Sequence, residues 1–113
     1  MEIINQKQVD RLAAEIGKEN VPILLEIFLN ELVGYESTLL PLEGQEQHAY
    51  LTEVSHALKS SAASFGADAL CNYSILLDKN AKSGEQLSSP SCKKEMLDLL
   101  KKTHSIYQNL FSQ

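Results

Sequence analysis

The stretch that decides the fold is residues 55–67, which read Ser-His-Ala-Leu-Lys-Ser-Ser-Ala-Ala-Ser-Phe-Gly-Ala. At about 100° per residue, as in an α-helix, the apolar residues in and just before this stretch gather on one face. They are Leu51, Val54, Leu58, Ala62 and Phe65. His56 points away from that face, toward water, and Lys59 and Ser60 lie one turn further along on its own side. The pattern predicts an amphipathic helix that ends at Gly66 and presents an accessible imidazole.

The composition is typical of a small helical domain. The chain has 113 residues, of which 43% are hydrophobic and 22% are charged, with 5 glycines and 3 prolines. We expect residues 1–113 to form a single domain with a core of ordinary size. Strand signals are weak, so the sequence favours an all-α fold.

Net charge and cysteine spacing argue against several kinds of site. A net charge of −5 argues against nucleic acid as the main partner, because phosphate binding needs a basic surface. Cys71 and Cys92 form no CxxC pattern, so we expect two reduced thiols and no metal site. The N-terminus lacks the apolar region of a signal peptide, and no apolar run is long enough to span a membrane. The expected location is cytoplasmic.

Five helical segments follow from the periodicity and the turn residues. Their expected ranges are about 6–16, 19 or 20 to 40, 45–66, 67–81 and 91 onward, with a polar surface loop over 82–90. Asn5 and Gln8 resemble a capping box at the first helix, and Ser91 is expected to cap the last helix. Pro22 suits the first turn of the second helix, and Pro41 ends it.

The fold expected from these segments is an antiparallel up-down four-helix bundle, with the short N-terminal helix capping one end. Gly66 can take the left-handed backbone conformation that reverses the chain, so the third and fourth helices should be antiparallel neighbours. The second helix is apolar around much of its circumference. It must therefore be covered on more than one side or present an apolar patch to a partner.

His56 is the candidate for chemistry. A neutral imidazole has one unprotonated nitrogen near pH 7, and that nitrogen can attack phosphorus. Lys59 can lie against the phosphoryl oxygens, and Ser60 is a small neighbour that could donate a hydrogen bond. Either ring nitrogen could react, and the more exposed one is expected to do so. The plainer alternative is that His56 is an ordinary surface residue.

The sequence lacks the features of a self-sufficient phosphotransfer enzyme. It contains no Gly-rich phosphate loop of the P-loop or kinase type, and no carboxylate cluster suited to Mg²⁺. In-line transfer needs charge neutralisation, usually by a metal ion, so a partner would have to supply it. The sequence therefore predicts a phosphoryl carrier without kinase activity, and with no cofactor or metal of its own.

The central stretch resembles the signature of histidine phosphotransfer (HPt) domains, which reads His-x-Leu-Lys-Gly-Ser-Ser-x-x-x-Gly-Ala. The residues that match it in type and spacing are His56, Leu58, Lys59, Ser61, Gly66 and Ala67. The chain departs from the pattern at Ser60, where the family usually has Gly, and at Ala62, where it often has Ser. The resemblance implies a four-helix bundle in which His56 is phosphorylated and Lys59 stabilises the phosphoryl group.

A wider similarity, over residues 20–22, 27–29 and 55–68, is to the quorum-sensing phosphorelay members of this family. It implies that His56 accepts a phosphoryl group from the receiver domain of a hybrid sensor kinase. The group would then pass to the aspartate of a response regulator of the LuxO type, and the flow could reverse when the sensors act as phosphatases. Mg²⁺ is expected in the partner receiver domain.

Two functions of different classes remain open. The protein is either a phosphocarrier working through His56 or a non-catalytic helical-bundle adaptor that binds a partner through exposed apolar surface. A monomer is expected in both cases. The docking surface is expected around His56, with Leu29, Val33 and Glu36 of the second helix as candidate contributors. Glu53, three residues before His56, is expected to be solvated rather than to orient the ring.

Overall fold

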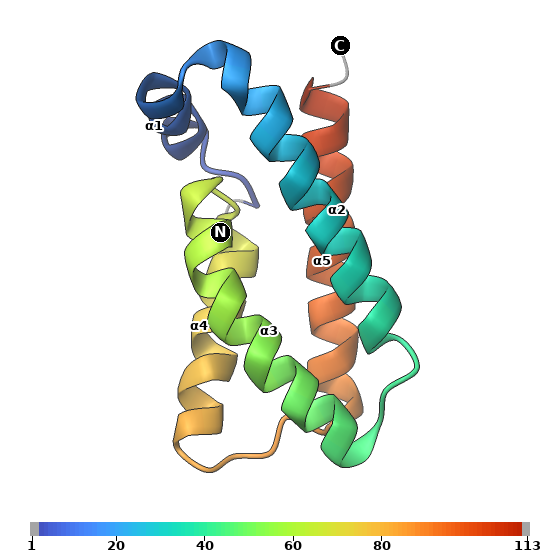
Figure 1. Ribbon diagram of the computed structural model, residues 1–113. Coiled ribbons are helices and arrows are strands. Elements are labelled where there is room, and N and C mark those ends of the chain that lie inside the picture. The colour runs from blue at the N-terminus through green and yellow to red at the C-terminus, as the bar shows by residue number, and fades with distance from the viewer. Residues whose placement is uncertain (1–2, 112–113) are drawn as a thin grey trace.

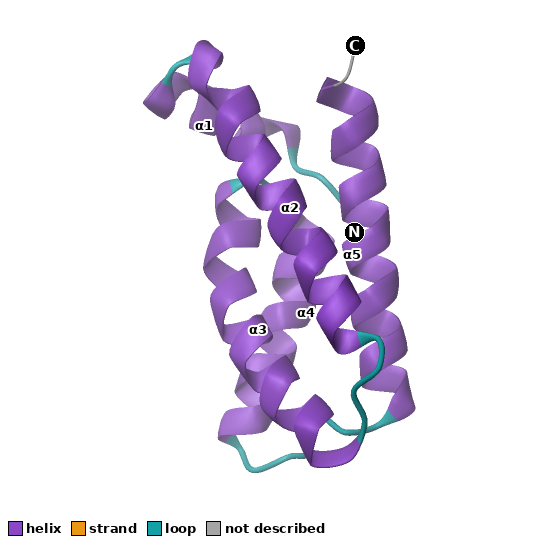
Figure 2. Cartoon of the chain, turned by 45° about the vertical axis from the view of Figure 1, so that its right-hand side comes forward, coloured by secondary structure: helices purple, strands orange, loops and turns teal. Residues whose placement is uncertain are grey.

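The described part of the chain consists of helices joined by loops and turns, and it contains no strand (Figures 1 and 2). The computed structural model describes the backbone of residues 3–111 and the side chains of residues 3–109. Its elements are α1 (Gln6–Ile16), the short 3-10 helix η1 (Lys18–Asn20), α2 (Val21–Leu39), α3 (Gly44–Ser64), α4 (Asp68–Lys82) and α5 (Pro90–Phe111). The predicted all-α class is confirmed. No helix of the described residues is long and apolar enough to cross a membrane.

The four long helices lie side by side, and successive ones run in opposite directions. In Figure 1 the chain descends along α2, rises along α3, descends along α4 and rises along α5. α3 packs mainly against α4, and α2 packs mainly against α5. α1 lies across the upper end, where it contacts both α2 and α3.

The apolar stripes predicted from the sequence form the core. On α3 the buried residues include Leu51, Val54, Leu58 and Ala62, so the face opposite His56 is the core-facing one. α2 buries one face and leaves other apolar side chains in solvent. Those exposed on α2 or just after it are Ile23, Ile27, Val33 and Leu40. Of the two alternatives for this helix, the structure therefore shows exposed apolar side chains.

Of the two helix caps predicted from the sequence, the structure confirms the one at Asn5 and contradicts the one at Ser91. The side chain of Asn5 accepts hydrogen bonds from the backbone N–H groups of Lys7 and Gln8, so Asn5 is the N-cap of α1 as predicted. The prediction that Ser91 caps the last helix is wrong. The helix begins one residue earlier, at Pro90, and the hydroxyl of Ser89 accepts from the N–H of Cys92 at 3.2 Å.

The turn between α3 and α4 is a Schellman motif centred on Gly66. The N–H of Ala67 donates to the carbonyl of Ala62 at 2.8 Å, and the N–H of Gly66 donates to that of Ala63 at 3.1 Å. Gly66 has φ +74°, in the left-handed region. Its carbonyl accepts from the N–H of Asn5 at 2.6 Å, which ties the segment before α1 to this turn.

Aromatic residues from three helices pack beneath the same turn. The rings of Phe28 and Phe65 stack with centroids 4.4 Å apart, and the ring of Tyr107 meets Phe28 edge-on at 6.0 Å. The hydroxyl of Tyr107 donates to the carbonyl of Phe65. Stacked and edge-on pairs are both favourable geometries, so the cluster joins α2, the end of α3 and α5.

At the opposite end, polar side chains of α3 hold the loop between α4 and α5. The buried amide of Gln47 donates to the carbonyls of Leu87 and Ser89, each at 2.9 Å. Nδ1 of His48 accepts from the N–H of Leu87 at 2.9 Å. His48 therefore has a structural partner in this loop, and Leu87 is fixed in the core.

Replacing Gly66 should destabilise the fold. A Cβ at this position would lie 2.5 Å from the carbonyl oxygen of Asn5, and the positive φ is unfavourable for any residue with a Cβ. We expect Gly66→Ala to lower the free energy of unfolding by about 1–3 kcal/mol from backbone strain alone. Urea unfolding followed by circular dichroism would measure the change.

Gly34→Ala is the matched control. Gly34 lies inside α2, and a Cβ added there would have no neighbouring atom within 4 Å outside its own helix backbone. Because alanine favours helix over glycine, this variant should gain about 0.5–1 kcal/mol. Equal effects of the two substitutions would contradict the assignment of Gly66 as the critical turn residue.

Candidate functional site

His56 lies near the middle of α3, on the face turned away from the core. Its side chain is 66% exposed, whereas Leu58 two residues later is fully buried. The predicted accessible imidazole is therefore present. The neighbouring residues on this face, Ser60 and Ala63, are exposed and small, so little bulk surrounds the ring.

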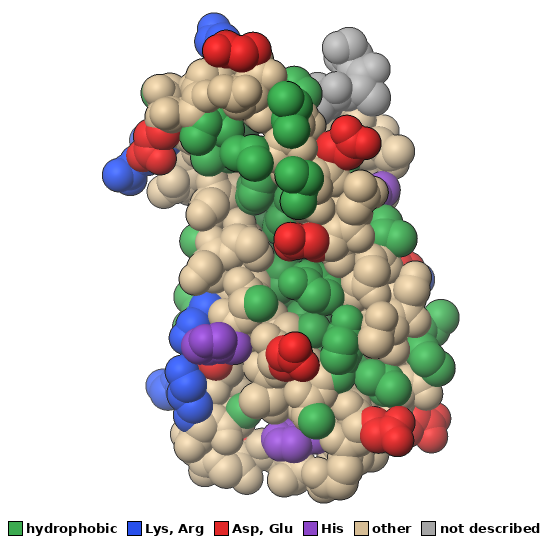
Figure 3. All heavy atoms as spheres, in the orientation of Figure 1, with side chains coloured by type: hydrophobic (Ala, Val, Ile, Leu, Met, Phe, Trp, Pro, Cys, Tyr) green, Lys and Arg blue, Asp and Glu red, His purple; other side chains and the backbone are tan. Residues whose placement is uncertain are grey.

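One carboxylate on α4 contacts both His56 and two lysines. Oδ1 of Asp78 lies 3.3 Å from Nδ1 of His56. Oδ2 of Asp78 accepts from Nζ of Lys59 and from Nζ of Lys82, each at 2.8 Å. We call these four residues the Asp78 cluster. Lysine or arginine side chains gather around a histidine at the left edge of the face shown in Figure 3, where the hydrophobic side chains lie further toward the middle.

The charges of the Asp78 cluster favour an ionised carboxylate. The side chain of Asp78 is only 10% exposed. Its pKa is lowered well below the usual range, mainly by the hydrogen bonds from Lys59 and then Lys82, with a smaller contribution from His56, while desolvation opposes the shift. The pKa of Lys82 is raised, chiefly by its hydrogen bond with Asp78. Two ammonium groups against one carboxylate leave one net positive charge beside the imidazole.

Lys59 and Ser60 differ in their surroundings. Lys59 was predicted on the exposed face beside His56, and it is there, but its side chain is 30% exposed and bonded to Asp78. Ser60 is exposed, and its hydroxyl makes no hydrogen bond among the residues that the structure describes. Three other motif residues are structural in their placement: Leu58 and Ala67 are buried, and Gly66 forms the turn.

Sequence reasoning missed Asp78 and Lys82. The available signal was an acidic residue inside the apolar stripe of the fourth helix, since Asp78 follows Cys71 by seven residues and Ser74 by four. All three positions are buried. A carboxylate in such a position needs a partner, but the sequence alone does not say that the partners come from α3.

The α2 residues expected to contribute to the docking surface have different surroundings in the structure. Tyr35 of α2 and Tyr50 of α3 both pack against the core. Burial raises the pKa of Tyr35, and the nearby Glu31, Tyr50 and Glu53 raise it further. By contrast, Glu36 pairs with Lys101 of α5 at 3.8 Å. Leu29 borders a hollow between α2 and α5. Of the three candidate contributors to the docking surface, Leu29 and Glu36 therefore lie beside α5, and Val33 is exposed. Their part in docking stays a prediction.

Glu53 does not replace Asp78 as a partner of the ring. It is exposed on α3, and no ion pair joins it to His56 among the described residues. This agrees with the predicted solvation of Glu53. The carboxylate beside the ring comes from the neighbouring helix instead.

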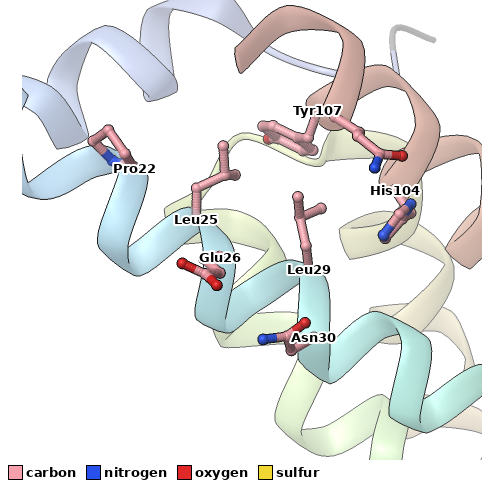
Figure 4. A pocket seen from close by; sticks show the side chains of 8 residues that line it. Pro22, Leu25, Glu26, Leu29, Asn30, His104 and Tyr107 are labelled. Carbon is pink, nitrogen blue, oxygen red and sulfur yellow. The ribbon is translucent and has the colours of Figure 1, made fainter. Parts of the chain in front are cut away.

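A hollow lies between α2 and α5 (Figure 4), and none of its lining residues belongs to the Asp78 cluster. Its volume is about 300 Å³, and its lining comes only from these two helices: Pro22, Leu25, Glu26, Leu29, Asn30, His104, Tyr107 and Gln108. His104 is the one histidine of this lining, and Tyr107 also belongs to the aromatic cluster. Across the described chain, no group of three or more His, Cys, Asp or Glu side chains could hold a metal ion.

Comparison with known proteins decides the family. The sequence profile of the Hpt domain matches residues 23–105, which include the whole Asp78 cluster. The chain belongs to the Hpt domain family. Its relatives in that family include proteins called phosphorelay protein LuxU. The one from Vibrio cholerae is 54% identical over 109 residues, covering 96% of each chain.

Two further LuxU relatives have nearly the same coverage. The protein from Vibrio harveyi is 50% identical over 108 residues, or 96% of this Hpt protein and 95% of its own length. The protein from Vibrio vulnificus is 48% identical over 107 residues, or 95% and 93% respectively. No solved structure gives a significant match. The resemblance expected from the central stretch is confirmed.

The lowered pKa of Asp78 predicts an acid-sensitive contribution to stability. A carboxylate with a depressed folded-state pKa stabilises the fold fully above its unfolded pKa of about 3.9, and this stability is lost as pH falls through the lower folded-state pKa. We therefore expect the difference in unfolding free energy between wild type and Asp78→Asn to shrink as pH falls from 7 to 2. Urea unfolding at several pH values would measure it.

Asp98→Asn is the control for this experiment. Asp98 is an exposed carboxyl on α5. Its substitution should leave the pH dependence of stability close to that of wild type. A difference between wild type and Asp78→Asn that stays constant over this pH range would contradict the predicted linkage.

Proposed function

We propose that this protein is a phosphorelay intermediate that carries a phosphoryl group on His56. It would accept the group from a receiver-domain aspartate of a hybrid sensor kinase and pass it to a response-regulator aspartate. The observation that carries the proposal is the exposed imidazole of His56 beside a locally positive cluster, on a chain of the Hpt domain family. An accessible nucleophile and a nearby positive charge are what transfer between two macromolecules requires.

The roles within the site follow from charge and size. His56 is the nucleophile that forms the bond to phosphorus. Lys59, with its ammonium on the same helix face, would neutralise charge on the phosphoryl oxygens as the group arrives. Ser60 keeps the approach to the ring open, and its hydroxyl could donate a hydrogen bond to the group.

The partner would supply the rest of the chemistry. Phosphoryl transfer needs in-line positioning and neutralisation of charge on the transferred group, for which proteins commonly use Mg²⁺. We propose that this ion belongs to the receiver domain and that the present chain brings no cofactor. The chain then needs no kinase activity, because both donor and acceptor are aspartates of other proteins.

The wider setting is proposed from the relatives. Because similar proteins of this length are named phosphorelay proteins, we place this chain in a phosphorelay, in quorum-sensing signalling with a response regulator of the LuxO type. We further propose that it works in the cytoplasm as a monomer. The unit that carries His56 would be an antiparallel up-down bundle of α2 to α5, with α1 capping one end.

Transfer from a pre-phosphorylated receiver domain tests this function. With Mg²⁺ present, the wild type should take up a label that is labile to acid and stable to base, as expected for phosphohistidine. His56→Gln should take up none, because it lacks the nucleophile. Lys59→Ala should take up label about tenfold more slowly, since it loses one charge-assisted hydrogen bond.

His104→Gln is the matched control, because it removes a histidine from the hollow between α2 and α5 and leaves the cluster intact. It should take up label like the wild type. If the folded wild type takes up no label from any of several receivers, the carrier function is wrong. Retained partner binding in that case would favour the alternative, a non-catalytic adaptor with exposed apolar surface.

A further inference from the structure

We propose that Asp78 is the positioning residue for His56: it presents Nε2 as the nucleophile, and it holds Lys59 and Lys82 until a phosphoryl group arrives. The inference rests on the proposed phosphocarrier function and adds to it a residue from a different helix. A single, largely buried carboxylate contacts the imidazole and both ammonium groups.

The carboxylate orients the ring through Nδ1. Oδ1 of Asp78 faces Nδ1 of His56 at 3.3 Å. The ammonium groups at Oδ2 keep the carboxyl ionised, and an ionised carboxylate only accepts hydrogen bonds. Nδ1 must therefore carry the ring proton. In the neutral imidazole the lone pair then lies on Nε2, the nitrogen that does not face Asp78.

This arrangement lets transfer proceed without moving a proton. The lone pair of Nε2 forms the N–P bond while the P–O bond to the receiver's aspartate breaks, and the electron pair of that bond leaves with the aspartate carboxylate. The ring keeps its proton on Nδ1 and becomes positively charged. The Asp78 carboxylate stabilises that charge, as a buried aspartate stabilises an imidazolium in hydrolytic triads. In onward transfer the N–P electron pair returns to Nε2, and the original tautomer is restored.

The same carboxylate keeps two cations within reach of the ring. Lys59 and Lys82 share Oδ2, so neither ammonium has the carboxylate to itself. Asp78 is fixed on α4 and 10% exposed, whereas the side chain of Lys82 is 63% exposed. A phosphoryl group on Nε2 brings anionic oxygens that compete with Oδ2 for the ammonium groups. Lys82 is thus a second cation for the phosphoryl group, next to Lys59.

The ring tautomer gives a test that does not depend on any partner. Nitrogen-15 NMR of the unphosphorylated wild type at neutral pH should show Nδ1 of His56 protonated and Nε2 unprotonated. Asp78→Leu, which removes the acceptor, should shift the population toward the Nε2-protonated form. A wild type with Nε2 predominantly protonated would overturn the proposal.

Transfer rates of two variants separate the charge of Asp78 from its hydrogen bond. Asp78→Asn keeps an oxygen that can accept from Nδ1 but loses the charge, whereas Asp78→Leu loses both. We expect uptake from a phosphorylated receiver to slow in the order wild type, Asn variant, Leu variant. The Leu variant should be slower by about tenfold to a hundredfold, as for loss of a charge-assisted hydrogen bond.

A purely structural role would give a different result. Both Asp78 variants leave Lys59 and Lys82 without their carboxylate and should lower the melting temperature. A residue that only stabilised the fold would not shift the ring tautomer of His56, and its variants would lose transfer only as far as they unfold. Asp98→Asn, an exposed carboxyl on α5, controls for net charge and should react like the wild type. Asp78 variants that are folded and transfer at the wild-type rate would overturn the proposal while leaving the carrier function intact.

Lys82→Gln and Lys79→Gln test the second cation. Both residues lie on α4 and both variants lose one positive charge, but of the two only Lys82 forms an ion pair with Asp78 among the described residues. Lys82→Gln should slow uptake severalfold, and Lys79→Gln should have little effect at physiological salt, where distant charges are screened. Equal effects of the two variants would indicate general electrostatic attraction and overturn the role of Lys82. Absence of label on the wild type would instead refute the carrier function, and the NMR result would still stand.

Discussion

The Schellman turn at Gly66 determines how α3 and α4 meet, and the site depends on that meeting. Because the turn is short, the two helices become antiparallel neighbours at once, and their contact is the most extensive in the described chain. His56 lies eight residues before the end of α3 at Ser64, and Asp78 lies ten residues after the start of α4 at Asp68. These positions are about 12 and 15 Å from the turn along helices that rise 1.5 Å per residue. The turn therefore brings the imidazole and the carboxylate to nearly the same height.

The Asp78 cluster places a paired, largely buried carboxylate beside an exposed imidazole. A charge removed from water is costly unless it is paired, and Asp78 meets this requirement with two ammonium groups. The pairing has a consequence for the surface as well. The whole chain has a net charge of −5, yet the area beside His56 carries one net positive charge. An anionic group that approaches this protein is repelled by its net charge and attracted by the ammonium groups beside the ring.

Contacts at the two ends of the bundle hold the helices in place, and His56 lies exposed between these ends. The aromatic cluster of Phe28, Phe65 and Tyr107 fixes one end of the helices, and Gln47 fixes the loop at the other end. His56 lies between them on a regular helix, where neighbouring turns restrain its backbone. A nucleophile on a rigid helix is presented in one place to each partner, so a partner can supply the remaining catalytic groups with correct geometry.

The sequence by itself determined the helices, the inward face of α3, the exposure of His56 and the turn at Gly66. These features depend on local rules: apolar side chains repeat with the helical period, and glycine takes a positive φ without strain. Only the tertiary structure decided that Asp78 and Lys82 join His56 and Lys59, and that Leu29 and Glu36 lie beside α5. The physical reason is that periodicity fixes the direction of a side chain around its own helix but not which neighbour covers it. Which neighbour covers a side chain depends on how the helices pack. Asp78 is 22 positions from His56 in sequence, and packing of α4 against α3 brings its carboxylate to 3.3 Å from the imidazole.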